Sequence, residues 1–147
     1  MSDAIEGKPF PTITDQTRPF WSGAAAGRLM MQKCSACGTV NFYPKPWCIE
    51  CGSRSLAWVE VRPSGTVYSH TVAYSVAMNY PAWQAELPLV MCLIDLDDGA
   101  RMYAQLTDCS PDDVRIGMRV DAYFASIGEG AGIPKFRPAK ASEASGT

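Results

Sequence analysis

Through most of the chain from Leu56 onward, apolar residues fall in short runs that are separated by glycine, proline and aspartate. Runs of this length, rich in valine, isoleucine and tyrosine, predict β-strands rather than helices. We expect strands at residues 56–61, 66–74, 89–96, 102–106, 119–124 and 134–138. The run at 89–96 is almost continuously apolar, which predicts a strand that is buried on both faces.

The connections between these runs contain residues that favour turns. Asp98 and Gly99 form a strong hairpin signal. Ser110 can cap a short helical turn that Pro111 begins. Two other signals, a turn and a flexible glycine-rich loop, lie at residues 63–65 and 128–132. Counted from the run at 66–74, there are five short strands with a helical turn between the third and the fourth, which is typical of a small barrel.

The N-terminal part of the chain predicts a tail followed by one short helix. Residues 1–14 contain glycine and two prolines and are expected to be irregular. A helix is expected at residues 15–27, with Asp15 or Thr17 as its N-terminal cap. The polar residues 140–147 predict a second, flexible tail.

Four of the six cysteines form two identical C-x-x-C-G units, made by Cys34 with Cys37 and by Cys48 with Cys51. Two residues between a pair of cysteines allow both sulfurs to face one ion. A glycine after each unit can adopt a positive φ and turn the chain back. Strands expected at 28–33 and 40–43 form a hairpin that brings the units together. The sequence therefore predicts a zinc ribbon.

Two alternatives to zinc exist for these cysteines. A redox dithiol needs only one C-x-x-C unit, so the presence of two matched units favours a closed metal site. A rubredoxin-like iron uses the same four thiolates and is the stronger competitor. We favour one structural zinc ion, because nothing else in the chain suggests electron transfer. A site with four cysteines has no open position and performs no Lewis-acid chemistry.

Composition and charge narrow the class of protein. The 147 residues are 47% hydrophobic and 19% charged, which is a normal globular balance. The net charge of -2 argues against a nucleic-acid-binding protein, because most such proteins carry a basic surface. There is no apolar run of about 18 residues that could span a membrane. Since residues 1–11 also lack an apolar signal segment, we expect a cytoplasmic protein without membrane contact.

Catalytic chemistry has few candidates in this sequence. His70 is the only histidine, and Cys92 and Cys109 are the cysteines outside the two units. Both His70 and Cys92 fall in predicted strands, so packing in the core is the expected role. We therefore expect no catalytic residue in this chain.

The long connection at residues 74–88 is a candidate contact surface. It carries Met78, Tyr80 and Trp83, and connections of this length are usually functional or disordered. It could bind a ligand or a partner, or it could fold back over the mouth of the barrel. Phe20 and Trp21 on the first helix form a second candidate patch, although packing on the ribbon is equally consistent with their position.

Two basic residues near the end of the chain form a third candidate. Lys135 and Arg137 flank Phe136 in the last predicted strand. They could hold an anionic group between them. An ordinary edge strand with solvated charges is the alternative.

Taken together, these motifs resemble a family of small proteins that have an N-terminal helix, a rubredoxin-like zinc ribbon and a C-terminal OB-fold. The resemblance covers about residues 17–138. It is carried by these segments: residues 17–21, 27–29, the two C-x-x-C-G units, 65–69, 88–95 with Gly99, 116–120 and 134–138. It implies a mainly β fold, with the ribbon at 28–56 and a five-stranded OB-fold barrel at 57–139.

The resemblance also implies a function. Members of this family are accessory subunits of thiolase-like enzymes, of thiolase-fold aldolases and of some hydratases that act on acyl-CoA. We therefore expect a subunit that is not catalytic alone, whose partner is a larger thiolase-like acyl-CoA enzyme, with acyl-CoA at a shared site. A nucleic-acid-binding OB-fold module is the alternative, with Tyr68, Tyr103 and Tyr123 stacking on bases. The net charge argues against it.

Overall fold

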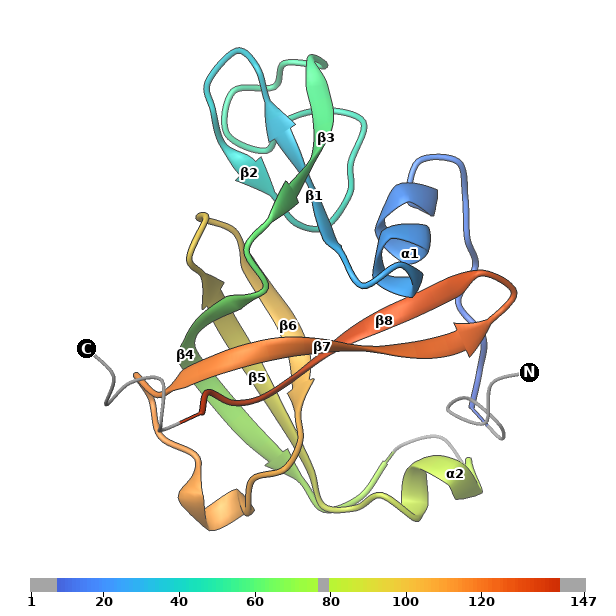
Figure 1. Cartoon of the computed structure of the whole chain (residues 1–147), viewed down its shortest axis with the longest axis vertical. Helices are drawn as coiled ribbons and strands as arrows, with labels where there is room; N and C mark the ends of the chain where they lie inside the picture. Colours follow the sequence, from blue (N-terminus) through green and yellow to red (C-terminus); the bar gives the residue numbers. More distant parts are fainter. Residues whose placement is uncertain (1–7, 77–79, 141–147) are drawn as a thin grey trace.

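The computed structural model describes residues 8–76 and 80–140 and divides into a helix, a ribbon and a barrel (Figure 1). The ribbon sheet contains β1 (Leu29–Cys34), β2 (Val40–Asn41) and β3 (Leu56–Val61). The barrel contains β4 (Ser64–Ala73), β5 (Leu89–Leu96), β6 (Arg101–Leu106), β7 (Arg119–Gly128) and β8 (Ala131–Pro138). The helical segments are α1 (Arg18–Ala25), α2 (Pro81–Gln84) and the single turn η2 (Pro111–Asp113). None of the helices in these two described ranges has the length and apolar character needed to span a bilayer.

The five barrel strands close in the order β4-β5-β6-β8-β7, with β7 pairing back to β4. Neighbouring strands are antiparallel except β6 and β8, which run parallel. This is the five-stranded barrel topology of an OB-fold, so the predicted mainly β fold with a ribbon and a barrel is confirmed. Side chains from every strand fill the barrel, among them Val67, Ile94, Met102, Val120 and Phe136.

The local turn signals with the clearest chemistry are confirmed. Gly99 has a φ of 114° in the turn between β5 and β6, and the backbone N–H of Leu96 donates to the carbonyl of Ala100 at 2.8 Å. The hydroxyl of Ser110 accepts the N–H of Asp112 at 3.3 Å and caps η2 as expected.

Residues 63–65 do not form the separate turn that their composition predicted. Ser64 and Gly65 instead begin β4, where Gly65 lies opposite Leu96. A Cβ atom at Gly65 would lie 2.4 Å from the carbonyl oxygen of Asp95. The glycine is therefore required because two strands approach closely, and not because the chain turns.

The glycine-rich segment at residues 128–132 is not a flexible loop. It forms the end of β7, a two-residue turn and the start of β8. The turn consists of Glu129 and Gly130, both with positive φ, between β7 and β8. Gly132 lies within β8, and a Cβ atom there would lie 2.6 Å from the backbone nitrogen of Ala25. The backbone of α1 therefore packs directly on β8, which positions this helix beside the barrel (Figure 1).

Three smaller expectations also change. Residues along β5 alternate between buried and partly exposed, so only one face of this strand is fully buried. The last strand is not an edge, because β8 pairs with both β7 and β6. The helix α1 begins at Arg18, and Thr17 occupies its cap position without a side-chain capping bond. The hydroxyl of Thr17 instead accepts the indole N–H of Trp21 at 3.2 Å.

Candidate metal centre and apolar groove

The ribbon brings the four predicted ligands together. The sulfur atoms of Cys34, Cys37, Cys48 and Cys51 all lie within 4.8 Å of one another. Two of the separations, Cys34 to Cys51 and Cys37 to Cys48, are 3.6 Å. Four thiolates bound tetrahedrally to one zinc at about 2.3 Å are about 3.8 Å apart. The cluster therefore has the dimensions of a closed site that could bind one zinc ion.

Each C-x-x-C-G unit forms the same tight loop. Gly38 has a φ of 82° and Gly52 a φ of 78°, conformations that favour glycine. The N–H of Gly38 donates to the carbonyl of Cys34 at 2.8 Å, and Gly52 makes the matching bond to Cys48 at 2.9 Å. The repeated sequence unit thus produces a repeated backbone geometry, and this geometry aims both pairs of sulfurs at one point.

Backbone donors stabilise the thiolate form of two ligands. The N–H of Cys51 lowers the pKa of Cys48 to about 6, against the opposing effect of burial. The N–H of Cys37 likewise lowers the pKa of Cys34. Since zinc binds thiolates, these bonds favour metal binding at neutral pH.

The pKa of Cys51 shows the effect of the neighbouring sulfurs. A backbone N–H from Ser53 lowers the pKa of Cys51, but its contacts with the other three sulfurs and its burial outweigh that bond and raise the pKa to about 12. Four thiolates at this distance repel one another unless a positive ion lies between them.

Sequence reasoning missed one residue of the metal centre. Asn41 on β2 is 2% exposed, and its amide nitrogen lies 3.6 Å from the sulfur of Cys48. Its amide oxygen accepts the N–H of Ile49 at 3.1 Å. Asn41 therefore connects the ribbon strand to the second cysteine loop and orients a ligand. An asparagine at the end of a two-residue strand carries no local signal for this role.

Replacement of Asn41 by alanine is expected to lower zinc affinity roughly 10–100-fold, as is usual for residues that orient a metal ligand. Competition with a chromophoric chelator measures this affinity. Ser35→Ala is the matched control, since this hydroxyl lies in the first cysteine loop and donates to the carbonyl of Ser55. Equal affinities for Asn41→Ala and the wild-type chain would contradict the role.

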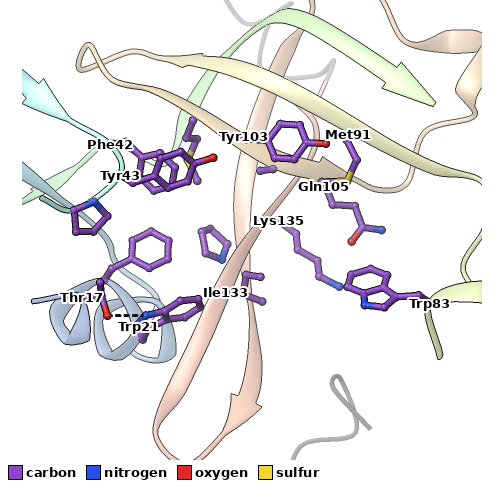
Figure 2. Close-up of a pocket in the computed structure, with 15 residues that line it drawn as sticks. Thr17, Trp21, Phe42, Tyr43, Trp83, Met91, Tyr103, Gln105, Ile133 and Lys135 are labelled. Atoms are coloured by element: carbon purple, nitrogen blue, oxygen red, sulfur yellow. Dashed lines mark hydrogen bonds between the residues drawn. The ribbon is translucent and has the colours of Figure 1, made fainter. Parts of the chain in front are cut away.

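A second feature is an apolar groove of about 450 Å³ on the outside of the barrel (Figure 2). Its floor is formed by residues of β5, β6 and β8, including Met102, which also packs inside the barrel, and its walls come from α1, the ribbon and α2. The residues that line it are Thr17, Phe20, Trp21, Phe42, Tyr43, Pro44, Trp83, Met91, Met102, Tyr103, Ala104, Gln105, Ile133, Pro134 and Lys135. The second and third strands of an OB-fold form its usual ligand-binding face. Here these are β5 and β6.

A smaller cavity of about 260 Å³ adjoins the groove. The two cavities share Trp21, Trp83, Ile133 and Lys135. The residues that line only the smaller one are Lys8, Pro9, Phe10, Pro11 and Ile127. The N-terminal segment, which we expected to be an irregular tail, thus forms one wall of this cavity.

The predicted contact residues do not all lie on one surface. Trp21 and Trp83 are half-buried and line both cavities, and Tyr80 is half-buried at the start of α2. Phe20 is only 8% exposed and lines the groove but not the smaller cavity, whereas Phe136 is fully buried and lines neither.

The remaining contact candidates lie elsewhere. Met78 lies outside the described residues. Arg137 is exposed and stacks on the ring of Tyr123, with 4.7 Å from its guanidinium carbon to the ring centroid. Lys135 points from the same strand into the groove (Figure 2). That these two cations hold one anion between them, one of the two alternatives that the sequence left open, stays a prediction.

The possible Cys–His pair has poor chemistry for a nucleophile. His70 lies opposite Cys92 in the pairing of β4 with β5. Burial raises the pKa of the Cys92 thiol to about 11, so little thiolate is present near pH 7. Burial also raises the pKa of Cys109.

These features define the chain as a zinc-ribbon protein joined to an OB-fold. Residues 21–57 match the family model described as "ChsH2, rubredoxin-like zinc ribbon domain". Residues 58–125 match the one described as "ChsH2, C-terminal OB-fold domain". A solved structure titled "Ltp2-ChsH2(DUF35) aldolase" has a TM-score of 0.76 and 33% identity, covering 89% of this chain and all of that one. The chain therefore belongs to the DUF35 family, as the resemblance had implied.

Two curated relatives are similar over most of the described fold. A "Probable enoyl-CoA hydratase alpha subunit" of Thermomonospora curvata is 35% identical over 138 residues, which is 94% of this chain and 42% of that protein. A "DUF35 domain-containing scaffold protein" of Methanocaldococcus jannaschii is 36% identical over 99 residues, which is 66% of this chain and 67% of that protein. The chain thus spans less than half of the Thermomonospora relative.

Proposed function

We propose that this chain is a non-catalytic accessory subunit of a thiolase-like enzyme that makes or breaks a carbon–carbon bond in an acyl-CoA. The observation that carries the proposal is the 33% identity to the ChsH2(DUF35) chain, all of which this chain covers, because the name of that structure pairs it with Ltp2 in an aldolase. The name of the Thermomonospora relative, a subunit of an enoyl-CoA hydratase, supports the same class of substrate.

The chemistry of the chain supports an accessory role. Four cysteines would complete the coordination of a zinc ion, and such a site stabilises structure and leaves no position for substrate. Burial keeps the thiol of Cys92, the cysteine opposite the histidine, protonated at neutral pH. The partner then supplies the reacting groups, and this subunit helps to shape the site that binds acyl-CoA.

The aromatic residues of the connection between β4 and β5 are the best candidates for the partner interface. Tyr80 and Trp83 are half-buried, and aromatic side chains of this kind dominate interface free energies. Truncating a central one typically weakens binding by about 2 kcal/mol or more. This connection also separates two adjacent barrel strands by more residues than a simple hairpin needs.

Co-expression with a thiolase-like neighbour in its genome tests the proposal. The chain alone is expected to be inactive, and the purified complex is expected to catalyse thiolytic or aldol cleavage of an acyl-CoA. Turnover by the isolated chain, or failure to form any complex with such an enzyme, would refute the accessory role.

The double variant Tyr80→Ala with Trp83→Ala tests the interface and is expected to weaken co-purification. Trp47→Ala is the matched control, since this tryptophan is 47% exposed on the ribbon and lines neither cavity. An unchanged complex in the double variant would contradict the interface while leaving the accessory role in place.

A further inference from the structure

Two lysines and one glutamate meet where the groove and the smaller cavity join. The ammonium group of Lys8 pairs with the carboxylate of Glu86 and lies 4.2 Å from the centroid of the Trp83 ring. The side chain of Lys8 is only 7% exposed, whereas that of Glu86 is 37% exposed, so the lysine is the shielded member of this pair. Glu86 thus neutralises one of the two positive charges.

Lys135 supplies the second charge. Its side chain is half-buried and runs from β8 across the groove toward Trp83 (Figure 2). Within residues 8–76 and 80–140, its ammonium group makes no hydrogen bond or ion pair. Burial lowers the pKa of Lys135, and the nearby Lys8 lowers it further, against the opposing effect of Glu86.

An ammonium group in such surroundings favours an anion. Removing a cation from water is costly unless an opposite charge or a set of acceptors replaces the lost hydration. The groove around Lys135 is instead lined by aromatic and aliphatic side chains, with few polar groups such as the amide of Gln105. One negative charge beside Lys135 would bring this region to neutrality.

The rest of the groove favours an apolar body. Its volume of about 450 Å³ falls within the roughly 300–1,000 Å³ typical of small-molecule sites. Met91 and Tyr103 form its floor on one side, and Trp21 and Ile133 line the other side (Figure 2). The shape and the charge together describe a ligand with a long apolar part and one anionic end.

We propose that the groove binds an amphipathic anion, with the apolar part along Tyr103 and Trp21 and the anionic group against the ammonium of Lys135. A carboxylate and a phosphate present the same chemistry to Lys135, so either can be the anionic group. This site is a property of the chain by itself and goes beyond the proposed function, which concerns assembly with an enzyme.

Titration of the full chain with decanoate, decyl phosphate and decanol tests the proposal. Binding is followed by calorimetry and by the fluorescence of the tryptophans, two of which line the groove. At least one anion is expected to bind about tenfold or more tightly than decanol, because a charge-assisted contact accounts for the difference. The tighter of the two anions identifies the head group.

Lys135→Met keeps the apolar stem and removes the charge. It is expected to abolish the preference for the anion and to leave decanol binding unchanged. Lys33→Met is the matched control, since Lys33 is exposed on β1 and lines neither cavity. Near-ultraviolet circular dichroism and zinc content show that each variant is folded.

Three results would overturn the inference. They are no binding of either anion below millimolar concentration, equal affinities for anions and decanol, and an unchanged preference for the anion in Lys135→Met.

A fourth result concerns a protein occupant. If Ile133→Trp, which fills the groove, prevents co-purification with the enzyme while neither anion binds the wild-type chain, the groove is a protein interface and the inference is wrong. The co-expression assay tests the proposed function independently of the titrations. Failure of the proposed ligand site therefore does not refute the accessory role, and failure of the accessory role does not refute the ligand site.

Discussion

Replacement of Cys48 by serine is expected to remove zinc from the chain and to unfold the ribbon. Cys48 is 1% exposed, its sulfur accepts the N–H of Glu50 in its own loop, and its replacement removes one of the four ligands of a closed site. Structural zinc sites of this kind contribute about 10–16 kcal/mol of apparent binding free energy, which exceeds the total stability of most small domains. Elemental analysis of the wild-type chain should give about one zinc, and the variant should contain little metal and be insoluble or partly unfolded.

Cys109→Ser is the control for this experiment. Cys109 is half-buried near η2 and is not part of the cluster, so its removal is expected to leave the metal content unchanged. Stoichiometric iron with a visible absorption band in the wild-type chain would show that the site holds iron, and the assignment to zinc would then be wrong.

Replacement of Gly132 by alanine is expected to destabilise the barrel strongly, because the added methyl group would collide with the backbone of α1. The added Cβ would lie 2.6 Å from the backbone nitrogen of Ala25 and 2.7 Å from the carbonyl carbon of Ala24. Both are backbone atoms of α1, which cannot move aside as a flexible side chain can. Overpacking of this kind typically costs about 1–3 kcal/mol, and we expect the upper end of that range. Denaturant unfolding measures the loss.

Gly130→Ala provides the contrast. Nothing lies within 4 Å of a Cβ atom at Gly130, but its φ of 74° disfavours any residue other than glycine. The expected cost is about 1–2 kcal/mol, with no displacement of the helix. Gly132→Ala should in addition change the near-ultraviolet spectrum of Trp21 on α1. A Gly132→Ala chain with wild-type stability and spectrum would contradict the direct packing of α1 on β8.

The parts of the fold that could be predicted from the sequence are those with local causes. The C-x-x-C-G units contain both the ligands and the glycines that form their loops, so a short window is enough to recognise them. The Asp98-Gly99 turn and the Ser110 cap depend in the same way on neighbouring residues.

The parts that could not be predicted have causes that are distant in the chain. Gly65 and Gly132 were interpreted as turn residues, because a sequence does not reveal that the backbone of Asp95 or Ala25 will approach them. Asn41 reaches the metal centre only after the ribbon has folded. The groove arises in the same way, since its lining residues come from segments between Thr17 and Lys135 that the fold alone brings together.

The barrel has one weakly closed side, and the groove lies across it. The described parts of β6 and β8 share a single ladder pair, Leu106 with Phe136, supported by the N–H of Thr107 donating to the carbonyl of Phe136 at 2.7 Å. Farther along the groove floor, Pro134 has no N–H to offer to β6. Amide hydrogens on this side of β6 should therefore exchange with solvent faster than those shared by β5 and β6. A molecule that lies in the groove would contact both β6 and β8 and keep them paired. Slower amide hydrogen exchange in β6 would therefore report its binding.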